Sequence, residues 1–193
     1  MFYKAILLLF SLLFIFQQGP VKTGDQPQPY EDVEAYEVYS AILPSDWTWR
    51  DAKANTLVIQ SKARAYKMCV NPEGESKEIL KDAISSYVEL SKKSWLLQRF
   101  FNMEKPYELI SSEEWKSTFE RGSWEKFYER YPNSRGYIDL SPVGFNKEKT
   151  VAIVYMGHHC GNLCGGGTFY VLQKKDGKWG LLTWRGSSCA WAS

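Results

Sequence analysis

Catalytic motifs are what this sequence most clearly lacks. It contains no Gly-x-Ser-x-Gly and no His-Glu-x-x-His, and its one glycine run, residues 165–167, is not followed by the Lys and Ser or Thr of a phosphate-binding loop. Histidine is scarce, with two in 193 residues, at positions 158 and 159. The sequence therefore predicts no cofactor, assigns no catalytic residue and no metal ligand, and leaves open whether the protein is an enzyme.

An excess of charge of one sign is also missing. The chain has 24 Lys and Arg against 22 Asp and Glu. Two of the bases, Lys4 and Lys22, lie in residues 1–24, which hold no acid, so the remainder carries 22 residues of each sign. No long run of Lys or Arg breaks this balance, whereas a nucleic-acid-binding protein needs a face that neutralises phosphates. Nucleic acid is therefore not an expected partner.

Long apolar runs are absent, and the longest apolar stretch covers only twelve residues. Residues 5–16 are apolar except for Ser11 and follow a short basic start. Twelve helical residues cover about 18 Å, against about 30 Å for the hydrocarbon core of a bilayer. We therefore expect residues 1–24 to be a signal peptide, with a short uncleaved anchor as the alternative because no A-x-A cleavage pattern follows. The membrane is then a partner only through this segment, and the rest is expected to be extracytoplasmic, either periplasmic or secreted.

The rest of the chain divides into a linker and one domain. Residues 25–33 are rich in Pro, Gln and Asp, which bury little surface, so we expect a linker there. Residues 34–193 are enough for one well-buried core and too few for two.

Apolar periodicity predicts helices upstream and strands downstream. We expect helices over residues 34–43 and 76–100, the second with a single apolar stripe, and a helix opened by a capping box of Ser111 and Glu114. Expected strands cover residues 56–60, 137–140, 150–156, 168–173 and 179–184, with a tight turn at Asp176-Gly177. The predicted fold class is α+β, with a C-terminal antiparallel β-meander packed against N-terminal helices in a single domain.

An aromatic stripe lies on a further short helix, formed by Trp124, Phe127, Tyr128 and Tyr131. Such a stripe can stack on sugars, but it is more typical of a helix that packs on a sheet. We therefore expect it to be part of the core.

Four cysteines, at positions 69, 160, 164 and 189, suggest disulfides in an exported chain. Three pairings are possible. Cys160 and Cys164 would close a small ring in which Gly161 supplies backbone freedom, and this bond leaves Cys69 to pair with Cys189. We favour this pairing, and the other two stay open.

Three segments of the last third resemble a family of uncharacterised small exported bacterial proteins. They are residues 130–146, RYPNSRGYIDLSPVGFN; residues 154–167, VYMGHHCGNLCGGG; and residues 171–179, VLQKKDGKW. They match the pattern RYPxSxGxIxLSxVGFN, VYxGxxCGxLCGxG and VLxKxDGKW. In that family the two central cysteines, here Cys160 and Cys164, look like a hallmark, whereas Cys69 and Cys189 look optional. The resemblance therefore supports a bond between Cys69 and Cys189. It implies an exported bacterial domain and no particular activity.

The stretch of residues 157–167 holds both histidines and two of the cysteines, between two predicted strands. We expect a hairpin loop braced by a disulfide. A metal site would need reduced thiols at Cys160 and Cys164, and His158 and His159 would point to opposite faces of a strand. A thiol-redox or Cys–His hydrolase site is the third interpretation, although three residues separate the cysteines and no helix follows them.

These observations favour an exported, disulfide-stabilised domain that binds an unknown ligand or protein. The candidate ligand-binding residues are His158, His159 and Trp184. The alternative is an extracytoplasmic metal-dependent or Cys/His hydrolase that uses the loop of residues 158–164.

Overall fold

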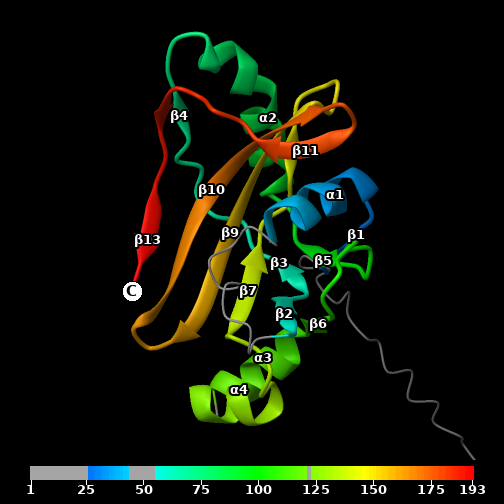
Figure 1. Ribbon diagram of the computed structural model, residues 1–193, viewed down its shortest axis with the longest axis vertical. Helices are drawn as coiled ribbons and strands as arrows, with labels where there is room; N and C mark the ends of the chain where they lie inside the picture. The colour runs from blue at the N-terminus through cyan, green and yellow to red at the C-terminus, as the bar shows by residue number, and fades with distance from the viewer. Residues whose placement is uncertain (1–25, 44–54, 121–122) are drawn as a thin grey trace, which may run out of the picture.

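The computed structural model describes residues 26–43, 55–120 and 123–193, so the expected signal peptide lies outside the described residues. The fold class is α+β, as predicted: helices pack on both faces and at one end of a mixed sheet (Figure 1). No helix in the described ranges is long and apolar enough to cross a membrane.

The main sheet has the strand order β11-β10-β9-β7-β2-β6. Its strands are β2 (Leu57–Gln60), β6 (Tyr107–Ile110), β7 (Tyr137–Leu140), β9 (Val151–Gly161), β10 (Cys164–Lys175) and β11 (Lys178–Leu181). Neighbours from β11 to β7 are antiparallel, whereas β2 is parallel to both β6 and β7. β8 (Gly144–Phe145) pairs with β9, and β13 (Ala190–Ala192) pairs with the Gly-rich part of β10.

The Asp-Gly turn forms as predicted between β10 and β11. Asp176 and Gly177 have φ values of 49° and 74°, the left-handed conformation that a tight hairpin turn requires at both central positions.

Two smaller sheets flank the main one. β5 (Trp95–Leu97) lies between β1 (Gln28–Tyr30) and β3 (Lys62–Ala63), and β4 (Asn71–Pro72) pairs with β12 (Gly186–Ser187). β1 occupies part of the segment expected to be a linker. Because Tyr30 is buried and its hydroxyl accepts from the Val143 amide at 2.9 Å, this part packs with the fold instead of forming a tether.

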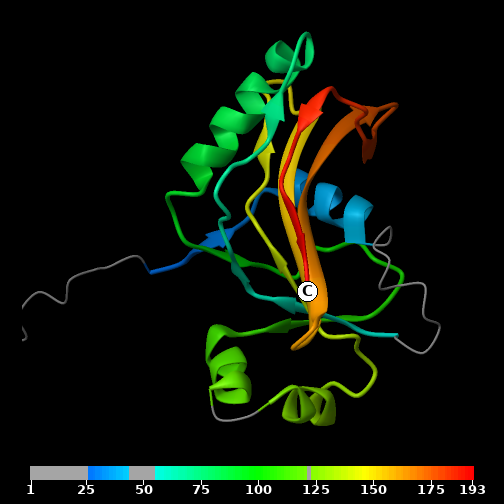
Figure 2. The ribbon, with the colours of Figure 1, turned by 90° about the vertical axis from the view of Figure 1, so that its left-hand side faces the viewer.

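The helices divide the core between the two faces of β9 and β10. α1 (Val33–Ile42) covers one face and α2 (Ser76–Leu90) covers the other, while α3 (Ser112–Phe119) and α4 (Trp124–Arg130) lie at one end (Figures 1 and 2). Alternate residues of β9 follow this division. Ala152 and Val154 pack in the cluster that contains α1, and Ile153 and Tyr155 pack in the cluster that contains α2.

Two helix predictions have different outcomes. The capping box is confirmed, with Ser111 and Glu114 each accepting a hydrogen bond from the other's backbone amide. The helix expected over residues 76–100 ends at Leu90, because Trp95–Leu97 turns away to form β5 and the Trp95 indole donates to the Leu90 carbonyl at 2.9 Å.

The aromatic stripe of α4 is part of the core, as expected. Phe127 and Tyr131 are buried in a cluster with Tyr137, and Trp124 and Tyr128 pack against it.

The disulfide-braced hairpin expected over residues 157–167 forms, but the loop predicted for this whole stretch is wrong. β9 continues to Gly161 and β10 begins at Cys164, so the strands are joined at residues 162–163. Glycines suggested a loop, but here they allow aromatic rings to lie against the strand. A Cβ at Gly167 would collide with the Tyr155 hydroxyl and the Trp191 indole.

Candidate functional site

The disulfides follow the pairing favoured from the sequence. Cys160 bonds Cys164 and Cys69 bonds Cys189, with Cα atoms 5.1 and 5.8 Å apart. All four sulfurs are therefore engaged, and none is a thiolate that could ligate a metal or attack a substrate. No group of three or more His, Cys, Asp or Glu side chains within the described ranges has the geometry of a metal site.

The three candidate ligand-binding residues do not meet. His158 lies on the same face of β9 as Met156, is 5% exposed, and its ring Nε2 donates to the Arg135 carbonyl. His159 points to the opposite face. Trp184 packs against the cluster beneath α2, as does Leu182.

His159 instead contacts Asp139, a residue that the sequence did not single out. Asp139 lies in the middle of β7, and its side chain is fully buried. The Tyr66 hydroxyl donates to Oδ2, the His159 Nε2 lies 3.2 Å from Oδ1, and the Arg64 guanidinium lies 4.0 Å from Oδ2. The sequence did hold a signal for Asp139, because a carboxylate in a short apolar strand needs buried partners.

The register of the sheet makes room for this carboxylate. Gly157 pairs directly with Asp139 across β7 and β9, and a Cβ at Gly157 would collide with Oδ1. Glycine at this position is therefore required by close approach and not by a turn.

Aromatic hydroxyls complete the cluster around Asp139. Burial, and then the Asp139 charge, raise the pKa of Tyr66 far above its ordinary value. The hydroxyl therefore stays protonated and donates a hydrogen bond to the carboxylate. Tyr66 stacks on Tyr155 with ring centroids 3.6 Å apart. The Tyr155 hydroxyl accepts from the Trp191 indole at 2.5 Å. These contacts hold Tyr66 in place, and Arg64 lies beside its ring at the edge of a cleft.

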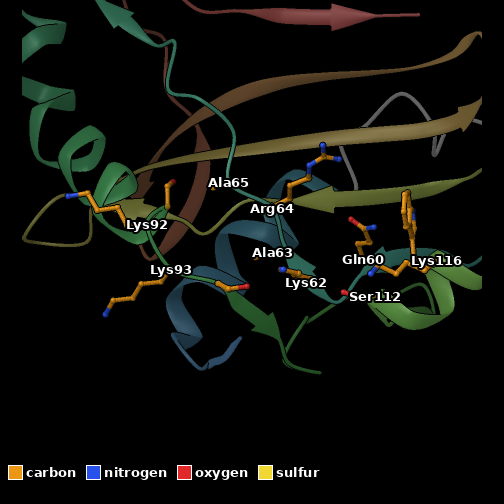
Figure 3. A pocket seen from close by; sticks show the side chains of 12 residues that line it. Gln60, Lys62, Ala63, Arg64, Ala65, Lys92, Lys93, Ser112 and Lys116 are labelled. Carbon is orange, nitrogen blue, oxygen red and sulfur yellow. The ribbon is translucent and has the colours of Figure 1, made fainter. Parts of the chain in front are cut away.

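That cleft, of about 650 Å³, lies between the end of α2 and the start of α3 and is floored by the chain that follows β2 (Figure 3). Its lining contains no acidic residue. We call it the cationic cleft after its five basic residues, Lys62, Arg64, Lys92, Lys93 and Lys116.

Local structure explains why bases gather there. Alternation along β3 buries Ala63 and leaves its neighbours Lys62 and Arg64 exposed on the cleft side. Lys92 and Lys93 follow the C-terminus of α2, where the helix dipole favours positive charge. Lys116 is on the exposed side of α3.

The positive charge of the cationic cleft is only partly balanced. The Lys92 ammonium pairs with the exposed Glu89 carboxylate at 2.6 Å, and the Arg64 guanidinium lies near Asp139 and 5.3 Å from the Tyr66 ring. Lys62 and Lys116 form no ion pair with any residue that the structure describes.

Three uncharged polar atoms in the lining, the Ser91 Oγ, the Ser94 Oγ and the Trp115 Nε1, are buried without a hydrogen-bond partner among the described residues. The Ser94 Oγ is buried and has no hydrogen bond to any described residue, while the Ser94 carbonyl accepts from the Gln28 amide at 2.9 Å. A buried hydroxyl normally has a partner, so this atom is suited to a ligand that supplies one.

Comparison with protein-family models, with curated proteins and with solved structures gives no match. The resemblance to small exported bacterial proteins therefore stays a prediction.

Proposed function

We propose that residues 34–193 form an extracytoplasmic binding module whose cationic cleft takes an anionic ligand. The observation that carries this proposal is the lining of the cleft, in which five basic residues occur with no acid. The volume of about 650 Å³ lies within the range of ligand sites, about 300–1,000 Å³.

Electrostatics supports an anion in two ways. Neighbouring cations repel one another, so a bound anion lowers their mutual repulsion as well as forming new ion pairs. The cleft is also open to solvent at Lys62 and Arg64, where screening by salt is strong. Binding should therefore weaken steeply as ionic strength rises.

Two disulfides support the proposed location, because such bonds persist in oxidising compartments outside the cytoplasm. The predicted signal peptide leads to the same proposal.

Calorimetric titration of the intact protein with citrate and with inorganic phosphate, at low and high salt, tests the proposed function. The double variant Lys62→Gln/Lys116→Gln removes two charges that lack ion pairs within the described residues. Each charge–charge contact is worth about 1 kcal/mol in high dielectric, and the variant removes two such contacts. Citrate binding should therefore weaken at least about tenfold. Lys77→Gln/Lys178→Gln is the matched control, since both lysines are exposed and neither lines the cleft.

Two results would reject the proposal. One is an intact protein that binds neither anion at low salt. The other is a control variant that loses as much affinity as the cleft variant, because the effect would then come from total charge and not from the site.

A further inference from the structure

The charges of the cationic cleft are spread along it. Lys92 and Lys93 lie at the end formed by α2, Arg64 and Lys62 lie over the floor, and Lys116 lies at the end formed by α3 (Figure 3). One small anion could contact only part of this series. The spread matches an extended ligand with several negative groups.

Uncharged polar groups lie between the bases. Gln60, Ser94 and Ser112 offer an amide and hydroxyls that both donate and accept hydrogen bonds, and Trp115 adds an aromatic surface. This combination suits rings that have hydroxyls at their edges and apolar faces. The buried Ser91 Oγ, Ser94 Oγ and Trp115 Nε1 gain most from a ligand, because none of them has a hydrogen-bond partner within the described residues.

The main chain of the floor does not suit an acidic peptide. Extended peptides bind mainly by pairing with free backbone groups of an edge strand. β3 is the edge strand of its sheet, but it pairs with β5 and the amides on either side of it are engaged. The Ser61 amide donates to the Ile110 carbonyl and the Arg64 amide to the Leu140 carbonyl, both at 2.8 Å. Recognition in the cleft therefore falls to side chains.

From these observations, and resting on the proposed function, we infer that the ligand is an acidic oligosaccharide, a linear sugar chain with carboxylate or sulfate groups on successive rings. The bases contact the acidic groups, and the Ser, Gln and Trp side chains contact the rings between them.

A length series of oligogalacturonates, from one to six rings, tests the inference by calorimetry. Affinity should rise at least about tenfold from one ring to four, because each added ring brings another charge to the cleft. A neutral galactose oligomer of four rings should not bind. A hexaglutamate peptide and a single-stranded DNA hexamer are titrated at the same salt concentration as competing classes of polyanion.

Ser94→Ala provides a readout independent of charge. It should weaken binding of the four-ring oligogalacturonate about fivefold, the effect of one neutral hydrogen bond, and leave citrate binding unchanged. Ser85→Ala is the matched control, on the exposed side of α2 and outside the cleft.

The outcomes separate the two proposals. Citrate binding without any dependence on sugar length, or tighter binding of the peptide or the DNA, overturns the oligosaccharide inference and leaves the anion site standing. An unchanged affinity in Ser94→Ala also counts against the inference. Failure of every anion to bind overturns both.

Discussion

The two disulfides should contribute very different amounts to stability. Cys69 and Cys189 are 120 residues apart in the sequence, whereas Cys160 and Cys164 are 4 apart. Each bond restricts the unfolded chain by a loop-closure entropy that grows with the logarithm of the loop length. At 25 °C the long loop gives about 5 kcal/mol and the short ring about 2 kcal/mol.

The folded state adds a second difference. Cys69 is partly buried against the cluster beneath α2. Cys189 precedes β13, which pairs with the Gly-rich part of β10. Loss of this bond therefore also loosens the attachment of the strand that carries Trp191. Cys160 and Cys164 flank a turn that the β9–β10 ladder already holds together.

Urea unfolding of Cys69→Ala/Cys189→Ala and Cys160→Ala/Cys164→Ala measures the contrast. The first variant should lose about 5 kcal/mol, close to the whole stability of many domains, and the second about 2 kcal/mol. The first should also show a larger dependence of free energy on urea, because its unfolded chain is more expanded. Equal losses, or a larger loss for the short ring, would refute the loop-entropy reasoning.

Two further changes probe the interior and the pH response. Gly157→Ala should destabilise the fold by about 1–3 kcal/mol in urea unfolding, because its methyl group meets Asp139; the strand residue Gly180, with open space around it, is the control and should tolerate Ala within about 1 kcal/mol. The Ser111 amide holds the pKa of Glu114 below its ordinary 4.5, so this stabilisation is complete above pH 4.5 and is lost as the pH falls through the folded-state pKa. Glu114→Gln should therefore flatten the acid limb of stability against pH, and an unchanged acid limb would contradict this assignment.

Features that depend on neighbouring residues could be predicted from the sequence. The Asp176-Gly177 turn needs two residues that tolerate positive φ, and the capping box needs a hydroxyl and a carboxylate three positions apart. The Cys160–Cys164 bond is equally local. The turn, the capping box and this disulfide are each determined by a few residues that are close in the sequence.

The pairing of strands from distant segments could not be predicted. The parallel contacts of β2 with β6 and β7 join three separate segments, and no local pattern specifies them. The glycines of residues 157–167 led to the prediction of a loop. In the structure they lie in paired strands, where they allow Tyr155 and Trp191 to approach the backbone closely. Those contacts come from outside the segment, so the segment alone indicated a loop.

The cationic cleft shows why total charge says little about a local site. Several acids elsewhere in the fold contact bases outside the cleft: Glu34 and Glu37 both contact the Lys174 ammonium, at 2.6 and 3.1 Å, and Asp32 contacts Lys149 at 2.9 Å. These acids lower the net charge of the chain, but none of them lines the cleft. The near-neutral total therefore argues against a protein that is basic throughout, but not against a short polyanion in one cleft. For this reason the DNA hexamer belongs in the titration series: the spacing of the cleft cations and the Ser, Gln and Trp side chains between them, not the net charge, must favour a sugar chain over it.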